Sequence, residues 1–353
     1  MNFTLHLTEA CNMNCAYCTR EKRAVRMSEE VLDAACDLAF AEGSRAGLCF
    51  FGGEPLLERG LIQRAVSRCA DLSRKTRKPV QYRMTTNGTL LDDEFLALAL
   101  RENIEIGLSF DGTAQDIARH YADGRGTMAV LEAKAKALLR VQPHCYAMMT
   151  IAPQAAGKTA ESVKYLYQLG FRRITMTPAY GFRVSWDDST LALLMQQLRE
   201  IAAFWSACIL QGDAFYFSPL DAKIRECITG SQPAERCHLG FRQMPVAPDG
   251  KIYACTQFIG DADYCLGDVF HGLDREKQRE LARRDATPDS CRECALRPRC
   301  TNSCGCLNRL ETGDERRVSP MQCSYERALI ELADATADRL YAAAPQRFAK
   351  RYQ

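Results

Sequence analysis

The sequence predicts an α/β fold, in which a parallel sheet that is closed or partly closed is followed by a cysteine-rich region. Six short apolar segments have the pattern of β-strands, and each pair is separated by enough residues for a helix; they lie at 4–8, 47–51, 80–85, 104–110, 145–151 and 174–177. After Tyr180 this alternation stops. A long amphipathic helix is predicted over 187–211, and closely spaced cysteines begin at Cys237. In such sheets the chemistry gathers at the carboxyl ends of the strands.

These patterns divide the chain into three predicted parts. Residues 1–184 form the strand-and-helix domain, residues 185–214 a bridging helix, and residues 215–353 a second domain that ends in a C-terminal helix. The helix after the first strand is the clearest of the individual elements. Ser28 can cap it, Gly43 can end it in a left-handed conformation, and an apolar stripe is formed by Val31, Leu32, Ala35, Leu38 and Ala39.

Composition narrows the class of protein. A net charge of +2 and the absence of a basic stripe argue against a nucleic-acid partner. The sequence lacks both a signal peptide and an apolar run of membrane-spanning length, so we expect a cytoplasmic protein without a membrane association. Its 18 cysteines lie mostly in tight clusters of a long chain, which favours metal or cluster ligation over disulfides.

The first cluster of cysteines follows the first strand directly. Cys11, Cys15 and Cys18 have Cys-x3-Cys-x2-Cys spacing, with the aromatic Tyr17 before the last of them. A [4Fe-4S] cluster normally takes four thiolates, so three cysteines leave one iron able to chelate a small molecule. A structural zinc site is the alternative interpretation, but zinc usually requires four closed protein ligands.

This loop resembles that of the radical S-adenosylmethionine (SAM) superfamily. The resemblance implies a partial (β/α)6 barrel of the TIM type, with one [4Fe-4S] cluster on Cys11, Cys15 and Cys18. It also implies that SAM binds the open iron, and that an electron from the cluster cleaves SAM to a deoxyadenosyl radical that abstracts hydrogen. The cofactor supplies the chemistry and the protein orients it.

Further motifs at strand ends resemble the SAM-binding segments of that superfamily. The second strand ends in Gly52, Gly53, Glu54 and Pro55, which resemble the motif whose backbone holds the cofactor's amino group, and the glycines permit a close approach. Alone, such a segment is usually a turn. Thr86 and Asn87 after the third strand, and Ser109 and Asp111 after the fourth, resemble residues near the ribose and the methionyl carboxylate.

Arg119 corresponds to an arginine that pairs with the cofactor carboxylate in that superfamily. The alternative interpretation of Arg119 is a solvated helix residue.

The second half carries a seven-cysteine pattern that resembles the SPASM domain of peptide-modifying radical enzymes. The resemblance implies two auxiliary [4Fe-4S] clusters, and therefore three clusters in all. One would be held by Cys291, Cys294, Cys300 and Cys323, and the other by Cys237, Cys255 and Cys304. The eighth ligand stays open between Cys227, Cys265, Cys306 and an iron that takes a substrate thiolate. On its spacing alone, Cys-x2-Cys-x5-Cys-x3-Cys also suits a zinc knot.

The segment after Cys255 resembles enzymes that join a cysteine sulfur to a carbon of a ribosomal peptide, so the expected reaction is a thioether crosslink. Two alternatives are a carbon-carbon crosslink and the oxidation of serine or cysteine by anaerobic sulfatase maturases. Those maturases carry an aspartate base directly after this cysteine, where this chain has Thr256. Other carboxylates that could act as a base are Asp261, Asp263 and Asp268, although each is also suited to a surface loop.

The expected partners follow from this resemblance. They are a ribosomal precursor peptide and an electron donor of the flavodoxin or ferredoxin type. Because the chain starts almost at its first strand, we expect the leader of the peptide to be recognised by a separate protein or by the SPASM surface. Two non-enzymatic classes remain as alternatives: an iron-sulfur electron carrier and a zinc-stabilised binding module. Neither would explain the GGEP, TTNG and SFDG motifs.

Overall fold

The computed structural model describes residues 1–230, 239–285 and 287–352. The chain separates into two compact units, each built from segments that are distant in sequence. The first unit comprises Met1–Asn14, Arg20–Leu108 and His238–Asp285, and the second comprises Cys15–Thr19, Ser109–Cys237 and Ala286–Gln353. These units cut across the predicted boundaries at 184 and 214.

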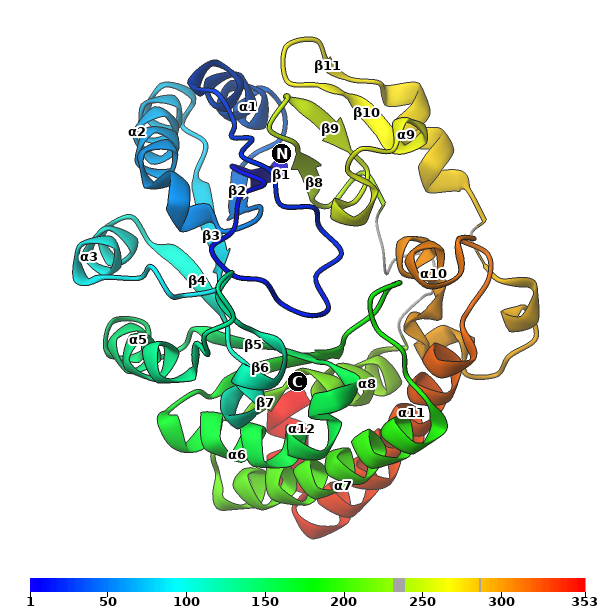
Figure 1. Ribbon diagram of the computed structural model, residues 1–353. Helices are drawn as coiled ribbons and strands as arrows, with labels where there is room; N and C mark the ends of the chain where they lie inside the picture. The colour runs from blue at the N-terminus through cyan, green and yellow to red at the C-terminus, as the bar shows by residue number, and fades with distance from the viewer. Residues whose placement is uncertain (231–238, 286, 353) are drawn as a thin grey trace. The chain divides into compact units, whose positions relative to one another are not determined.

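The first unit is built on a sheet in which the first four strands of the chain are parallel. β1 (Asn2–His6), β2 (Ala46–Phe51), β3 (Val80–Thr86) and β4 (Ile104–Ser109) pair in that order. On its other edge β1 pairs in parallel with β8 (Met244–Val246), so that β1 lies between two strands (Figure 1). The sheet then continues in antiparallel fashion through β9 (Lys251–Tyr253), β10 (Cys265–Asp268) and β11 (Gly272–Leu273).

Helices follow the strands of the first unit in turn. They are α1 (Glu29–Ala41), α2 (Arg59–Thr76), α3 (Asp93–Arg101) and α9 (Arg275–Arg283), with short 3-10 helices η1 (Pro55–Glu58), η5 (Thr256–Phe258) and η6 (Ala262–Tyr264). The predicted cap of α1 is confirmed, because the Ser28 side chain accepts a hydrogen bond from the Val31 backbone at 3.1 Å. The predicted stripe is buried except for Leu38, which is half-buried.

The second unit contains three parallel strands and the longest helices. Its strands are β5 (Tyr146–Ile151), β6 (Arg173–Pro178) and β7 (Tyr216–Phe217). Its helices are α4 (Gln115–Ala118), α5 (Met128–Val141), α6 (Thr159–Leu169), α7 (Asp188–Gln211), α8 (Ser218–Thr229), α10 (Gly305–Thr312), α11 (Pro320–Ala343) and α12 (Pro345–Tyr352). The 3-10 turns are η2 (Gly112–Ala114), η3 (Pro153–Lys158), η7 (Asp289–Cys291), η8 (Arg297–Arg299) and η9 (Thr301–Ser303). The long helices α7 and α11 lie side by side (Figure 1).

The six predicted strands are confirmed to within two residues at each end. β1 shows the largest difference, because it ends at His6 rather than Thr8. Leu7 still donates to the Phe51 carbonyl, but Glu9 donates to Val25, and Thr8 forms an isolated bridge with Arg26. The chain therefore leaves the sheet two residues earlier than the apolar pattern suggested, and the cysteine loop begins there.

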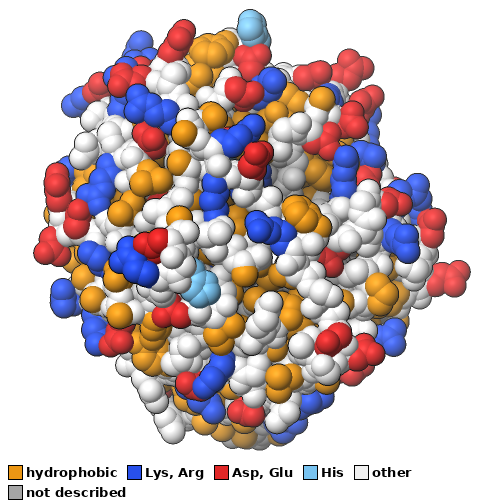
Figure 2. Space-filling view, viewed as in Figure 1, with side chains coloured by type: hydrophobic (Ala, Val, Ile, Leu, Met, Phe, Trp, Pro, Cys, Tyr) orange, Lys and Arg blue, Asp and Glu red, His pale blue; other side chains and the backbone are white. Residues whose placement is uncertain are grey.

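Surface charges agree with the near-neutral composition. On the face shown in Figure 2, basic and acidic side chains are interspersed and neither sign forms a continuous stripe. Within the described residues, no helix combines the length and apolarity needed to cross a bilayer.

Candidate cofactor and cluster site

The two glycines after β2 lie directly against the backbone that leads into Cys11. Gly53 donates its N–H to the Thr8 carbonyl at 2.8 Å. A Cβ atom at Gly52 would stand 2.4 Å from the Thr8 carbonyl oxygen, and one at Gly53 would stand 2.1 Å from that of Ala10. Gly52 also has a φ of +129°, which side chains rarely adopt. Any other residue would push the cysteine loop away from this strand end.

Glu54 links the segments that follow three strands of the first unit, through its backbone N–H and its buried carboxylate. Its backbone N–H donates to the Ala10 carbonyl at 2.9 Å. Its carboxylate accepts hydrogen bonds from Thr86 Oγ1 at 2.6 Å, the Asn87 backbone at 2.8 Å and the Leu56 backbone at 3.0 Å. Burial raises the pKa of Glu54, and these three donors act in the opposite direction. The side chain is fully buried, so it positions the neighbouring loops.

Asn87 connects this carboxylate to the first cysteine. Its side-chain amide donates to Asn12 Oδ1 at 2.8 Å and lies 3.8 Å from Cys11 Sγ, within hydrogen-bonding range for sulfur. The Met13 N–H also donates to Cys11 Sγ, at 3.4 Å. Asn12 in turn donates to Thr89 Oγ1 at 2.8 Å. Hydrogen bonds to ligand sulfurs are one means by which a protein adjusts a cluster's potential, so Cys11 has surroundings that suit a cluster ligand.

In the second unit, Asp111 and Arg119 form a buried ion pair. The residues are 2% and 6% exposed, and the guanidinium donates from Nε at 2.6 Å and from Nη2 at 3.1 Å to the two carboxylate oxygens. The Thr150 backbone donates to the same carboxylate at 2.8 Å. Burial alone would lower the pKa of Arg119, but the Asp111 carboxylate raises it above its ordinary range. The alternative of a solvated helix residue is therefore wrong for Arg119.

Arg119 also lies beneath Tyr17. Its guanidinium carbon is 5.4 Å from the centre of the Tyr17 ring, and burial raises the pKa of the Tyr17 hydroxyl well above its ordinary value. The Ala16 N–H donates to the Ala118 carbonyl at 2.8 Å, which fixes the segment that carries Cys15 and Cys18. A cation stacked on an aromatic ring is stabilised further when both are desolvated.

Sequence reasoning missed several polar residues that support these groups. Gln115 is fully buried, accepts from the Asp111 backbone at 2.9 Å and donates to Thr127 at 2.9 Å. Asn12 and Thr89 complete the network around Asn87. Asn12 carried a weak signal, because it is an amide next to the first cysteine. Ser109, a predicted cofactor contact, is half-buried at the last position of β4.

In the second unit, Cys291 interacts electrostatically with Cys294, Cys323 and Cys300. Burial raises the pKa of Cys291, and Cys323 and Cys294 raise it further. Burial raises the pKa of Cys300 to about 12, with a smaller contribution from Cys291. These are the four cysteines predicted to hold one auxiliary cluster. Within the described ranges no three His, Cys, Asp or Glu side chains are grouped for a single metal ion, and a four-iron cube spaces its ligand sulfurs farther apart than one ion does.

The other predicted cluster ligands are distributed between the units. Cys255 precedes η5 in the first unit, whereas Cys304 precedes α10 in the second and its Sγ is 3.1 Å from that of Cys306. Cys265 Sγ lies 3.5 Å from the Gly267 carbonyl, and Cys227 is exposed on α8. Cys237 lies outside the described residues. No disulfide joins cysteines within the part of the chain that the structure describes.

The three candidate bases have the geometry of loop carboxylates. Asp261 accepts from the Asp263 backbone at 3.1 Å, and Asp263 is exposed. Asp268 accepts from the backbones of Phe270 and His271 at 2.8 and 2.9 Å, and from the His271 ring. Partial burial would raise the pKa of Asp268, but the bonds from His271 and Phe270 lower it overall. A general base works best with a pKa near the operating pH, so this lowering makes Asp268 a weak base.

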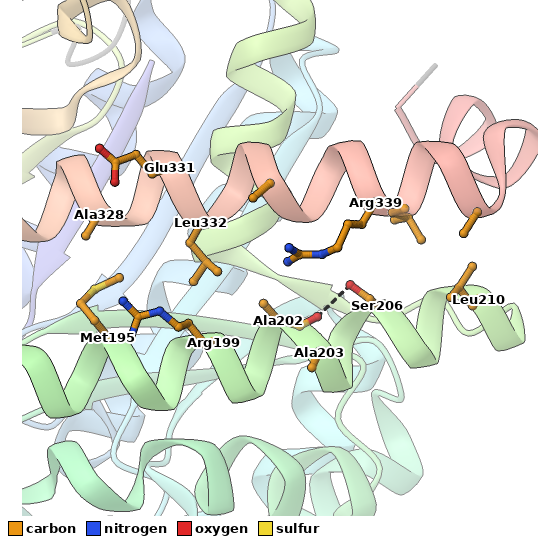
Figure 3. Close-up of a pocket in the computed structure, with 13 residues that line it drawn as sticks. Met195, Arg199, Ala202, Ala203, Ser206, Leu210, Ala328, Glu331, Leu332 and Arg339 are labelled. Carbon is orange, nitrogen blue, oxygen red and sulfur yellow. Dashed lines mark hydrogen bonds between the residues drawn. The ribbon is translucent and has the colours of Figure 1, made fainter.

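A groove of about 690 Å³ between α7 and α11 contains none of the predicted site residues (Figure 3). Its walls are mostly apolar, with Arg199, Glu331 and Arg339 among the residues that line it.

Together these observations define an α/β protein in which a glycine-rich strand end packs against the backbone that leads into the first cysteine. The chain belongs to the radical SAM superfamily: the family model described by that name matches residues 5–194, more than half of the chain. The resemblance stated for the cysteine loop is thereby confirmed.

Two relatives are similar to different shares of this chain. An uncharacterized protein MJ0907 of Methanocaldococcus jannaschii is 30% identical over 175 residues, which are 48% of this chain and 60% of that protein. This chain therefore matches less than two thirds of that relative's length. A cysteine-type anaerobic sulfatase-maturating enzyme of Clostridium perfringens is 22% identical over 284 residues, covering 74% of this chain and 75% of the relative.

Solved structures share the fold over most of the chain. The structure of native anSMEcpe with bound AdoMet and Cp18Cys peptide has a TM-score of 0.81 at 18% identity and covers 98% of both chains. Streptococcus suis SuiB bound to precursor peptide SuiA has a TM-score of 0.64 at 15% identity, covering 91% of this chain and 75% of that one. The predicted fold class, a partial (β/α)6 barrel followed by a SPASM-type region, is confirmed by these matches.

Proposed function

We propose that this protein is a radical SAM enzyme that modifies a ribosomally made peptide. The observation that carries the proposal is the arrangement around Cys11, where Gly52 and Gly53 press against the cysteine loop and Asn87 lies at hydrogen-bonding range from the Cys11 sulfur. Cys11, Cys15 and Cys18 would hold the cluster, which together with SAM would supply radical chemistry for hydrogen abstraction.

The chain's own residues orient the cofactor in this proposal. The amino group of SAM carries N–H donors and needs acceptors, which the backbone carbonyls of Gly52 and Gly53 would provide. Arg119 keeps its positive charge beside Tyr17, because Asp111 holds it ionised. That charge attracts the methionyl carboxylate, while Thr86, Asn87 and Ser109 offer polar groups for the ribose. Glu54 holds the loops that carry Thr86 and Asn87 in position.

The proposed product is a thioether between a cysteine sulfur and a carbon of the peptide. Thr256 supports this reaction because it follows Cys255 at the position where sulfatase maturases are expected to carry their aspartate base. The neighbouring carboxylates Asp261, Asp263 and Asp268 are exposed or engaged in turns. Auxiliary clusters on the later cysteines would accept the surplus electron and, at an open iron, the substrate thiolate.

Two other reactions are alternatives. The 22% identity to an anaerobic sulfatase-maturating enzyme favours oxidation of serine or cysteine to formylglycine. A carbon-carbon crosslink is the second alternative, and the fold shared with SuiB bound to its precursor peptide supports a peptide substrate for it. All three reactions require a peptide partner and an electron donor of the flavodoxin or ferredoxin type.

Mass spectrometry of a cognate peptide separates the three products. After anaerobic turnover, a thioether lowers the mass by two hydrogens per link, protects the linked cysteine from iodoacetamide and survives reductants that open disulfides. A carbonyl-reactive peptide without a link would establish the formylglycine reaction instead. A linked peptide whose thiols are all alkylated would establish the carbon-carbon crosslink.

A further inference from the structure

A buried ion pair in the second unit joins α8 and α11. Lys223 on α8 is 3% exposed, Glu326 on α11 is 6% exposed, and Lys223 Nζ lies 2.7 Å from Glu326 Oε2. Glu226, one turn along α8, is 3.5 Å from the same Nζ. A fully buried lysine is uncommon in proteins unless its charge is paired, and this one has carboxylates on both helices.

The same pair holds the backbone on both sides of Cys300. Lys223 Nζ donates to the Arg299 carbonyl at 2.8 Å, and Glu326 Oε2 accepts from the Thr301 N–H at 2.9 Å. Cys300 stands between those two peptide groups, at the end of η8 and the start of η9. One ion pair therefore fixes the chain immediately before and immediately after a predicted cluster ligand.

A second ion pair strengthens this attachment. The Arg299 guanidinium binds Asp334 of α11 through both nitrogens, at 2.7 and 2.6 Å, and also donates to the Lys223 carbonyl at 3.1 Å. Bidentate arginine-carboxylate pairs are geometrically specific. The loop at Cys300 is consequently held from α8 and from α11, and α11 also carries Cys323.

Stability alone does not account for burying these charges. Replacing a buried ion pair by apolar residues of similar volume is often neutral or stabilising, because desolvation offsets the attraction between the charges. Buried ionic groups instead tend to fix one geometry among several. Here the fixed geometry is that of Cys300, whose distance from Cys291, Cys294 and Cys323 decides whether one cube can bind all four sulfurs.

We infer that Lys223 and Glu326 are positioning residues for an auxiliary iron-sulfur cluster, because their ion pair grips the peptide groups that flank Cys300. The inference rests on the proposed assignment of Cys291, Cys294, Cys300 and Cys323 to one cluster.

The test is the Lys223→Met variant, reconstituted anaerobically as the full chain and compared with wild type. We expect iron to be lost from the auxiliary site to a chelator about tenfold faster or more, as when an outer-shell partner of a metal ligand is removed. We also expect a shifted midpoint potential in an EPR-monitored redox titration. The matched control is Lys136→Met, which removes an exposed lysine that pairs with Glu132 at 2.5 Å on α5; both readouts should match wild type.

The double variant Lys223→Met/Glu326→Leu separates positioning from folding, because it removes the buried Glu326 carboxylate together with its lysine partner. We expect it to regain the wild-type melting temperature but to keep the fast iron loss and the shifted potential. Wild-type cluster behaviour in either variant would overturn the inference. The Cys300→Ala variant tests the proposed cluster assignment separately. If it retains every cluster signal, that assignment is wrong, independently of the result for Lys223.

Discussion

Buried polar side chains at the candidate site are satisfied mainly by one another. The Asp111 carboxylate accepts from Arg119 and from the Thr150 backbone, and Glu54 accepts three hydrogen bonds from two neighbouring loops. In a low-dielectric interior such a network is strong while it is complete. Removing one member leaves a buried group without its partner, and the cost then exceeds that of a surface contact.

Asp111→Asn should therefore destabilise the protein strongly. The variant leaves the Arg119 charge buried without a counter-charge, and we expect a loss of about 3 kcal/mol in the free energy of unfolding, the usual cost of breaking a buried pair. Denaturant titration by circular dichroism measures it. The matched control is Asp123→Asn, which removes the partner of Arg125 in a largely exposed pair and should have little effect. Equal losses in the two variants would contradict the role of burial.

His6, the last residue of β1, should make stability depend on pH. Burial, with a further contribution from Arg20, lowers its pKa from 6.5 to about 3, so the folded chain binds fewer protons than the unfolded chain between these pH values. Stability consequently falls as the pH decreases below 6.5. From about pH 7.5 to about pH 5.5, this residue should remove about 1.4 kcal/mol from the free energy of unfolding.

The measurement compares wild type with His6→Gln, which cannot titrate in that range. The variant should lose less stability on acidification by that amount, although its stability at neutral pH can differ for reasons of packing. Parallel pH dependences in the two proteins would show that His6 is not held neutral.

Individual residues could be predicted unevenly from the sequence. The cysteines and glycines could be predicted from their type and spacing, since few other residues bind iron. At Gly53, a Cβ atom would stand only 2.1 Å from the Ala10 carbonyl oxygen, so no other residue fits. Gln115 and the three bonds of Glu54 could not be predicted, because nothing in the local pattern says which distant backbone groups a buried polar side chain meets. For Arg119 the sequence predicted a cofactor contact, but not the buried ion pair that it forms with Asp111.

Among the secondary-structure elements, local signals decided what could be predicted. α7 was expected over 187–211, and Asp187 and Thr190 form the reciprocal capping box that begins it. β8 was not predicted. It has only three residues, one of them Pro245, and it exists because β1 offers an open edge. Such a strand depends on tertiary pairing rather than on its own propensity.

Ser28→Ala should measure the contribution of one such local signal. The side chain satisfies an otherwise unbonded N–H at the start of α1, and its loss typically costs about 1 kcal/mol in the free energy of unfolding. Ser44→Ala, in the exposed turn beyond the same helix, is the control and should leave the unfolding midpoint unchanged. If Ser28→Ala behaves like Ser44→Ala, the cap does not contribute to stability.

For the whole molecule, the cysteine pattern leads to a definite iron content. Three cubes correspond to about twelve irons per chain after anaerobic reconstitution, and Cys11→Ala/Cys15→Ala/Cys18→Ala should remove about four of them. The triple variant should also lose reductive cleavage of SAM completely. Iron and sulfide analysis together with SAM turnover measure both effects. Persistent SAM cleavage would refute the assignment of the catalytic cluster, and zinc in place of iron would refute the auxiliary clusters.

Domain organisation was the property that the sequence described least well. The alternation of strands and helices distinguishes the first half from the cysteine-rich half by pattern. The compact units are divided differently. Residues 244–273 extend the sheet of β1 in the first unit, whereas Cys15–Thr19 groups with the segments of the second unit. Pairing between segments distant in sequence leaves no local trace, so boundaries drawn from pattern alone do not coincide with the compact units.

The place of β8 beside β1 has a consequence for biosynthesis. β1 leaves the ribosome well before β8, because the strand that completes its second edge is translated only after residues 2–243. Nascent chains consequently carry an open, largely apolar parallel edge until β8 has been made, and such edges template pairing with other chains. Pairing across so long a separation is also slow to form. Premature termination before Met244 would therefore yield an aggregation-prone product, even though every residue of the SAM-binding motifs had been made.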